Sequence, residues 1–182
     1  MEIKRVVDAL HYRNTVKRLY YEAFPKVERF PWRILLKNEK KGTSEFLVFL
    51  EAEKVVGMSY VITGEEHAYL FYFAINKDLR GSGYGSKILK ELQNRYQSKN
   101  LFLAREVLDP KAENYECRVK RKSFYERNGF HDLPGHIMEA KVTFDIMGNK
   151  GRVFPEDYKK LVTTWGGRFM IKLMGLKLVI ND

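Results

Sequence analysis

Stretches of apolar residues in the first half of the chain predict a group of adjacent strands. Residues 45–51 and 54–62 are rich in Val, Phe, Leu and Tyr, and the short polar break Ala52-Glu53 between them predicts a hairpin. An aromatic-rich segment at residues 68–75 adds a third strand to this meander. Before the meander, the pattern predicts a strand and two helices, at residues 1–6, 14–23 and 31–36.

A helix with one apolar face is predicted soon after the third strand, at residues 86–97. Its apolar positions recur at helical spacing, and they are Ile88, Leu89, Leu92 and Tyr96. Another apolar segment, residues 101–107, follows the helix. Because a helix joins residues 68–75 to residues 101–107, we expect these two strands to be parallel neighbours with a right-handed crossover.

The remaining part of the chain alternates helix and strand. The pattern predicts a helix at residues 114–128, a strand at residues 137–147 and a helix at residues 155–165. Gly129 is placed to end the first of these helices as a C-terminal cap. The order of strands, helix, strand, helix and strand predicts an α/β fold with a mixed sheet and helices on its faces.

The length of 182 residues suits one compact domain. We expect residues 1–150 to form this domain and residues 151–182 to be a C-terminal helical extension packed on or near it. The tail at residues 168–180 mixes apolar and basic side chains. Three interpretations of the tail stay open, namely packing against its own domain, a helix on a membrane surface, or the seam of a homodimer.

The charge and the cysteine content narrow the classes of protein. The 33 basic and 23 acidic residues leave a net charge of +10, which favours anionic partners, although a solvated basic face is the simpler explanation. Basic residues do not alternate with exposed aromatics as in nucleic-acid-binding proteins, so that class is not favoured. The single cysteine, Cys117, excludes an internal disulfide, and no segment resembles a secretory signal or a membrane span. We therefore expect a cytoplasmic protein without membrane association, and we assign no metal ligands.

One glycine-rich loop carries most of the functional information. The segment Arg80-Gly81-Ser82-Gly83-Tyr84-Gly85-Ser86 lies between a predicted strand and a predicted helix. Glycine tolerates positive φ and lets the main chain approach a ligand closely. The unpaired N–H groups at the start of a helix and the positive end of its dipole attract a phosphate group, to which Arg80 can add a charge. The segment therefore predicts a pyrophosphate-binding loop.

Other glycine-rich motifs fit this loop less well. The dinucleotide-binding fingerprint requires the spacing G-x-G-x-x-G, whereas Gly81, Gly83 and Gly85 are spaced G-x-G-x-G. The phosphate loop of nucleotide hydrolases requires Gly-Lys-Ser/Thr, and here the order is Gly-Ser-Lys. A plain connecting turn has no need of three alternating glycines.

Two motifs together resemble the GNAT superfamily of acetyl-CoA-dependent N-acetyltransferases. Residues 80–85 are similar to its signature Arg/Gln-x-x-Gly-x-Gly/Ala, and residues 124–130, Phe-Tyr-Glu-Arg-Asn-Gly-Phe, are similar to its helix-ending Tyr-x-x-x-Gly-Phe. The resemblance covers residues 45–147 well. It implies a single GNAT-like domain with a mixed, mostly antiparallel sheet, a splayed parallel pair and helices on both faces. It also implies acetyl-CoA as co-substrate and direct transfer of the acetyl group to a primary amine of a small molecule or peptide.

The resemblance also implies roles for individual residues. Contacts to acetyl-CoA are expected from Phe73, Ala74 and Ile75 at the strand end, from the loop residues Arg80 to Ser86, and from Asn114. Tyr125 is expected to be the general acid, and a core aromatic is the alternative. Glu106 resembles the Leu-Glu-Val glutamate of family members that acetylate protein N-termini, so it is a candidate base, with a salt-bridged carboxylate as the alternative.

The sequence departs from the family at one position and leaves two questions open. The family often has an Asn seven residues before the tyrosine, where this chain has Arg118, and Asn114 lies one helical turn earlier.

The need for a base depends on the acceptor, since a lysine-like amine with a pKa of ~10.4 costs about 4–5 kcal/mol to deprotonate at pH 7 and an α-amino group only about 1 kcal/mol. A non-catalytic regulatory protein that binds CoA or acyl-CoA is the alternative to an enzyme.

Overall fold

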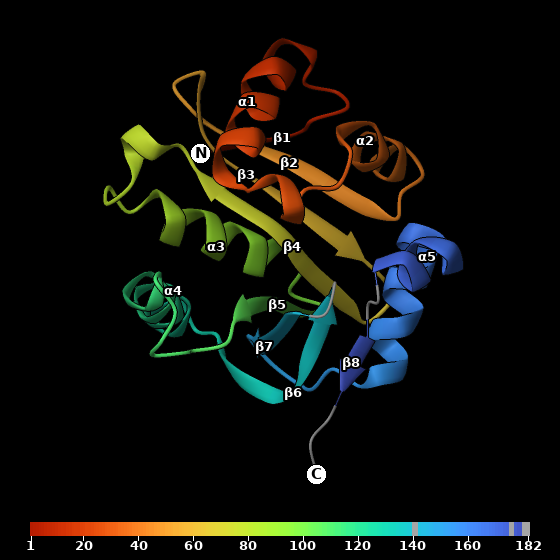
Figure 1. Ribbon diagram of the computed structural model, residues 1–182. Coiled ribbons are helices and arrows are strands. Elements are labelled where there is room, and N and C mark those ends of the chain that lie inside the picture. Colours follow the sequence, from red (N-terminus) through yellow and green to blue (C-terminus); the bar gives the residue numbers. More distant parts are fainter. Residues whose placement is uncertain (140–141, 175–176, 180–182) are drawn as a thin grey trace. The chain divides into compact units, whose positions relative to one another are not determined.

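The computed structural model divides the chain into two compact units (Figure 1). The first unit contains Met1–Thr63 and Leu70–Asn94, and the second contains Gly64–Tyr69 and Arg95–Asp182. Within them the structure describes residues 1–139, 142–174 and 177–179.

The first unit is built on strands β1 (Glu2–Arg5), β2 (Ser44–Glu51), β3 (Lys54–Thr63) and most of β4 (His67–Ile75). These strands lie in the order β1-β2-β3-β4, and β2 pairs antiparallel with both β1 and β3. The predicted hairpin is confirmed. Its turn places Ala52 and Glu53 at positive φ, 46° and 62°, a conformation that residues other than glycine seldom adopt.

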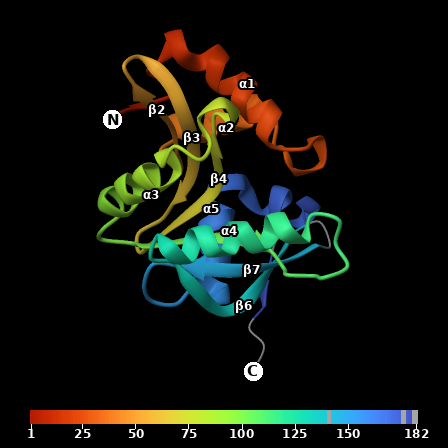
Figure 2. The same ribbon diagram turned by 90° about the vertical axis from the view of Figure 1, so that its left-hand side faces the viewer.

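Helices cover both faces of these strands (Figure 2). The elements α1 (Arg13–Ala23) and α2 (Trp32–Lys40) lie on one face, and α3 (Tyr84–Arg95) lies on the other. Three short 3₁₀ turns connect them, η1 (Leu10–Tyr12), η2 (Lys26–Glu28) and η3 (Lys77–Leu79). The predicted apolar face of α3 is confirmed, because Ile88, Leu89 and Leu92 are fully buried.

Helix α3 approaches the sheet closely at Gly57 of β3. A Cβ atom at this position would lie 2.8 Å from Ile88 Cδ1 of α3 and 2.9 Å from the backbone oxygen of Ala74. Both distances are shorter than real Cβ contacts allow, and the backbone oxygen cannot rotate away. The glycine therefore lets α3, and the loop that precedes it, lie close to the strands.

The substitution Gly57→Ala is expected to destabilise the protein by about 1–3 kcal/mol, because the added methyl group overpacks this contact. Urea unfolding followed by circular dichroism measures the change. The control is Ser59→Ala on the same strand, whose hydroxyl lacks a hydrogen-bond partner among the described residues. This control should change stability by less than about 0.5 kcal/mol. Equal stability of Gly57→Ala and the wild type would contradict the packing argument.

The second unit contains β5 (Asn100–Glu106), β6 (His131–Glu139), β7 (Val142–Gly148) and β8 (Lys177–Val179). They lie in the order β5-β7-β6-β8, and each neighbouring pair is antiparallel. Helices α4 (Tyr115–Arg127) and α5 (Pro155–Met174) lie on opposite sides of these strands (Figure 1). The predicted cap is confirmed, since Gly129 has φ 82° and its N–H donates to the Glu126 carbonyl at the end of α4.

The prediction of a single strand at residues 137–147 was wrong. The segment contains the end of β6 and most of β7, which pair antiparallel with each other. The preceding Pro134-Gly135 pair lies inside β6, where the register shifts between Leu133 and His136. A bulge accommodates a proline and a glycine that a regular strand would exclude.

The last helix extends beyond the predicted residues 155–165. It continues to Met174 across a non-helical Gly167 with φ 77°, and β8 then pairs with β6. The three interpretations of the tail at residues 168–180 depend on side chains that lie outside those the structure describes. Among the described residues, none of the helices has the length and apolar character required to cross a membrane.

Candidate active site

The predicted phosphate loop lies in the first unit, between β4 and α3. Its residues Arg80 to Gly83 are exposed. Gly81 and Gly83 have φ values of 80° and 81°, and the space that a Cβ would occupy at either one is open. Gly85, in contrast, belongs to the first turn of α3. Two of the three glycines are therefore required by the backbone conformation of the loop.

The start of α3 has the properties of an anion site. The first turn contains no acidic residue, and the first N–H groups of a helix have no partner within it. Lys87 lies over the Tyr84 ring, 5.3 Å from its centroid, so one ammonium group stands beside the first turn. The open loop, the unpaired N–H groups and the Lys87 ammonium group together fit the pyrophosphate of a coenzyme A ester.

The end of β4 leads directly into this loop. Phe73, Ala74 and Ile75 are its last residues, and only Ala74 is fully buried. The Asn76 N–H then donates to the Val56 carbonyl at 3.0 Å, and the Asn76 side chain accepts from the Asp78 N–H at 3.3 Å. Asn76 thereby holds the start of η3, from which the glycine loop departs.

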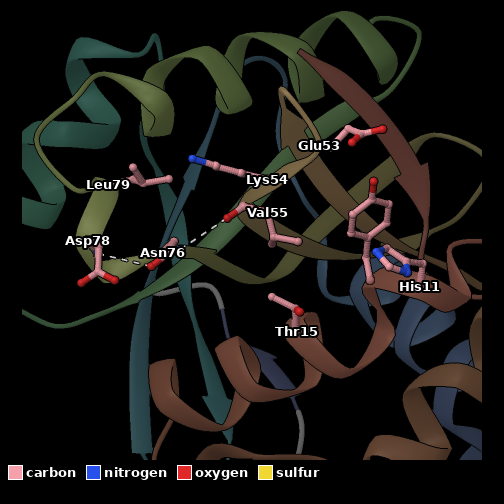
Figure 3. A pocket seen from close by; sticks show the side chains of 9 residues that line it. His11, Thr15, Glu53, Lys54, Val55, Asn76, Asp78 and Leu79 are labelled. Atoms are coloured by element: carbon pink, nitrogen blue, oxygen red, sulfur yellow. Dashed lines mark hydrogen bonds between the residues drawn. The ribbon is translucent and has the colours of Figure 1, made fainter.

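A cavity of about 380 Å³ opens beside η3 within the first unit (Figure 3). Asn76 lies in its middle and donates to the Val55 carbonyl at 3.4 Å. The cavity is lined by residues of η1 and α1, the β2–β3 hairpin and η3, namely His11, Tyr12, Thr15, Glu53, Lys54, Val55, Asn76, Asp78 and Leu79. None of these residues was predicted from the sequence to belong to a site. The lining contains both carboxylates and a lysine, so its charge does not indicate one class of ligand.

Tyr125 lies in the second unit, in the last turn of α4. Its side chain is 9% exposed, and its ring contacts those of Phe124 and Phe130. Burial raises the pKa of Tyr125 to about 12, although the charge of Arg121, one turn earlier, opposes this. The phenol therefore carries its proton at every physiological pH. Within the described part of the chain, no hydrogen bond engages the hydroxyl group.

Glu106 lies at the end of β5 and is held by three donors from α4 and its N-cap. Asn114 Nδ2 donates to Oε1 at 3.0 Å, Arg121 Nη1 donates to Oε2 at 2.6 Å, and Arg118 Nη2 lies 3.3 Å from Oε1. Partial burial alone would raise the pKa of Glu106, but these partners together lower it. The carboxylate is therefore ionised and only weakly basic.

Asn114 and Arg118 are bound to each other. The Arg118 Nε–H donates to Asn114 Oδ1 at 2.7 Å, and Arg118 Nη1 donates to the Val107 carbonyl at 2.8 Å. Both polar ends of the Asn114 side chain are therefore occupied within the second unit. The structure thus groups Asn114 with Glu106 and Arg118, and it groups Phe73 to Ile75 with the loop residues 80–86.

A second ionic group of this unit was missed by the sequence analysis. It contains Arg105, Asp132, Asp145 and His136, which are brought together by the pairing of β5, β7 and β6. These residues are up to 40 positions apart in the sequence, and the bulge at Pro134-Gly135 changes which side chains share a row. Pattern reasoning on single segments had no signal for them. Among the described residues, His, Cys, Asp and Glu side chains form no group of three or more that could hold a metal ion.

Comparison with solved structures shows the same fold in known acetyltransferases. A Bacteroides thetaiotaomicron protein of the GNAT family is 22% identical, with a TM-score of 0.75 over 92% of this chain and 99% of that one. An aminoglycoside 6'-N-acetyltransferase complexed with coenzyme A is 14% identical, with a TM-score of 0.63 over 85% and 100%. The ribosomal-protein-S18-alanine N-acetyltransferase of Escherichia coli is 17% identical, with a TM-score of 0.58 over 86% and 97%.

The fold and the sequence lead to the same family. The expected α/β fold with a mixed sheet and one parallel pair is confirmed. None of the curated proteins matches this sequence. The sequence model of the acetyltransferase (GNAT) domain matches residues 42–132, a range that includes the glycine loop, Glu106 and Tyr125. The chain therefore belongs to the GNAT family of acetyltransferases, whose co-substrate is acetyl-CoA.

Proposed function

We propose that this protein transfers the acetyl group of acetyl-CoA to a primary amine that attacks the thioester directly. The observation that carries the proposal is the glycine loop, in which Gly81 and Gly83 adopt positive φ and open the N-terminus of α3 to an anion. Bound acetyl-CoA supplies the activated acetyl group and the thiolate leaving group. The backbone N–H groups of residues 81–86 and the cations of Arg80 and Lys87 bind its pyrophosphate.

The end of β4 is proposed to bind the rest of the thioester. Successive residues of a strand present N–H groups on alternating sides, and Phe73 to Ile75 precede the loop directly. An N–H group there can donate to the carbonyl oxygen as it becomes an oxyanion. Such a donor stabilises the transition state through the main chain and needs no particular side chain. Phe73, Ala74 and Ile75 can therefore be assigned to this role although their side chains have no chemical feature in common.

Tyr125 is proposed to donate a hydrogen bond, and finally a proton, to the departing thiolate. Its hydroxyl has no other partner among the described residues, and its raised pKa keeps it protonated. Arg121 is expected to assist because its charge stabilises the phenolate that would form. The raised pKa only keeps the proton in place and makes the phenol a weaker acid, so the support for a general acid over a core aromatic comes from the hydroxyl that no other described group engages and from the charge of Arg121.

Glu106 as the general base stays a prediction. Its ion pairs with Arg118 and Arg121 would be weakened whenever it accepted a proton, and they lower its pKa. A base of this kind suits an α-amino group better than a lysine-like amine, because the α-amino group needs little help at neutral pH. The structural neighbours that act on an aminoglycoside and on the alanine of a ribosomal protein represent these two kinds of acceptor.

The proposal is tested by acetyl-CoA binding and by acetylation of an amine panel. The panel contains kanamycin, cadaverine and a peptide with N-terminal alanine, and release of free thiol reports turnover. We expect calorimetry to detect acetyl-CoA binding and at least one amine to be acetylated. Failure of the wild type to bind acetyl-CoA at millimolar concentration, or to acetylate any panel member, would refute the proposal.

The substitution Gly83→Ala is expected to weaken acetyl-CoA binding at least tenfold, because it disfavours positive φ in the loop and narrows the approach to the phosphates. Gly42→Ala is the matched control. Gly42 also has positive φ, 76°, and open space around its Cβ position, but it lies in the turn after α2. Both variants should lose about 1–2 kcal/mol of stability from the same backbone strain. Only Gly83→Ala should show the loss of affinity.

A further inference from the structure

Two tyrosine hydroxyls of the first unit bind the main chain between α1 and α2. The Tyr72 hydroxyl of β4 donates to the Glu28 carbonyl at 2.5 Å and accepts from the Phe30 N–H at 3.1 Å. The Tyr20 hydroxyl of α1 donates to the Phe30 carbonyl at 3.0 Å. Side chains therefore bind three backbone groups of residues 24–31, a segment that we call the α1–α2 connection.

Aromatic rings add contacts at both ends of the α1–α2 connection. The Phe24 ring lies 4.7 Å from the Tyr72 ring, and the Phe30 ring lies 5.5 Å from the Phe71 ring, measured between centroids. The Tyr72 ring also meets the Tyr20 ring edge to face at 5.1 Å. Both ends of the connection are thus held against two consecutive residues of β4.

The middle of the connection has little apolar burial of its own. Residues 25–28 are exposed, and Val27 is 86% exposed. Phe30, in contrast, is 5% exposed, and a buried backbone N–H requires a hydrogen-bond partner. Loss of the Tyr72 hydroxyl would leave that N–H unsatisfied or displace the segment. The position of the connection therefore depends on the tyrosine hydroxyls.

The tethered connection lies beside the place proposed for the thioester. Tyr72 directly precedes Phe73 to Ile75, the residues assigned to the pantetheine end of acetyl-CoA. A strand advances about 3.3 Å per residue, so Phe71 and Tyr72 lie within about 7 Å of Phe73 along the strand. An amine that attacks the acetyl carbon must come to this end of β4, and the connection held by Phe71 and Tyr72 borders its approach.

We infer that Tyr72 is a positioning residue for the acceptor amine. The inference rests on the proposed function and extends it to the acceptor. The Tyr72 hydroxyl fixes the α1–α2 connection at Glu28 and Phe30, and the Tyr20 hydroxyl supports it at the Phe30 carbonyl. Because neither hydroxyl is assigned to the reacting atoms or to the glycine loop, their loss should affect binding of the acceptor and spare binding of acetyl-CoA.

The test compares Tyr72→Phe with the wild type, using the panel amine that the wild type acetylates fastest. We expect the KM for this amine to rise about fivefold to tenfold, the effect of losing one or two neutral hydrogen bonds. The kcat and the dissociation constant of acetyl-CoA should stay within about twofold, because the change removes binding of the acceptor and not of the transition state alone.

Tyr60→Phe is the matched control. The Tyr60 hydroxyl, on the neighbouring strand β3, also accepts one hydrogen bond and donates another, from Ser44 Oγ at 2.6 Å and to the Leu35 carbonyl at 3.2 Å. It therefore ties down α2 and not the α1–α2 connection. We expect this variant to lose comparable stability in urea unfolding while the KM for the amine stays within about twofold of the wild type.

Hydrogen exchange gives a readout that does not depend on turnover. Tyr72→Phe should increase amide exchange in residues 26–30, whereas Tyr60→Phe should leave exchange there unchanged. If Tyr72→Phe does not fold, Tyr20→Phe decides, because it removes only the bond to the Phe30 carbonyl and should raise the same KM by a smaller factor.

An unchanged KM in the folded tyrosine variants of the tether, or an equal rise in Tyr60→Phe, would overturn the inference. Unchanged exchange in residues 26–30 of Tyr72→Phe would overturn it as well. A wild type that does not bind acetyl-CoA would instead refute the proposed function, and the inference with it.

Discussion

Replacing Tyr125 by phenylalanine is expected to lower kcat by about 10–100-fold, because a hydrogen bond to a charged group contributes about 1.5–3 kcal/mol. The affinity for acetyl-CoA should change little, since the ring and its contacts with Phe124 and Phe130 are retained. Burial raises the pKa of Tyr125 to about 12, so we also expect no loss of wild-type activity from its ionisation up to pH 10. Steady-state kinetics and calorimetry on both proteins measure these quantities.

The control for this substitution is Tyr115→Phe. Tyr115 is the first residue of the same helix, so its loss tests for general effects of removing a hydroxyl from α4. Its turnover should remain within about twofold of the wild type, as is usual for a change away from the reacting atoms. Equal turnover of Tyr125→Phe and Tyr115→Phe would remove the assignment of Tyr125 as the acid.

Replacing Glu39 by glutamine is expected to stabilise the protein by about 3 kcal/mol at pH 8 and to have little effect near pH 4.5. Glu39 is 0% exposed at the end of α2, and burial raises its pKa from 4.5 to about 7. The charge of Arg5, 3.6 Å away, and the amides of Phe46 and Val7 offset this only in part. Neither carboxyl oxygen has a well-formed hydrogen bond among the described residues.

The direction of the pH effect follows from the raised pKa. Between pH 4.5 and about 7 the folded protein holds a proton on Glu39 that the unfolded chain has released. Wild-type stability from this group is therefore complete below pH 4.5 and is lost as the pH rises through about 7. In the glutamine variant this dependence disappears. Arg5 keeps its hydrogen bond to the Glu39 backbone carbonyl at 3.1 Å, so the variant leaves the arginine partnered.

Urea unfolding at pH 5 and pH 8 measures the effect for the wild type and for Glu39→Gln. Glu22→Gln is the control, because Glu22 is exposed on α1 and forms a 3.9 Å ion pair with Arg18. An exposed pair of this kind contributes only ~0–1 kcal/mol, so the control should be nearly neutral at both pH values. A Glu39→Gln variant that is destabilised at pH 8 would show that the ionised carboxylate is well solvated or well paired.

The local features of the chain were largely predictable from sequence. The hairpin at Ala52-Glu53, the apolar face of α3 and the helix end at Gly129 were all predicted and confirmed. Each depends on a few consecutive residues, through a turn, a helical period or a positive φ. The family was also identified from two short motifs, and the GNAT domain match confirms it.

Features that depend on pairing between distant segments were not predictable. Residues 137–147 were predicted as one strand because this segment contains no glycine or proline, whereas β6 ends at Glu139 and β7 begins at Val142, and the Pro134-Gly135 pair lies at the register shift inside β6. The strand β8 is three residues long and owes its place to pairing with β6. Such pairing is specified by tertiary contacts and not by the local sequence.

The sequence by itself determined the glycine loop at the start of α3 and the tyrosine near the end of α4, because backbone conformation and helical period are properties of neighbouring residues. Only the tertiary structure decided which charged and titratable groups lie close together and which are buried. It surrounds Glu106 with arginines of α4, buries Glu39, and joins His136 to Asp145 and Arg105 across three strands. Burial and charge act through space, and side chains that are distant in sequence become neighbours only when the strands have paired.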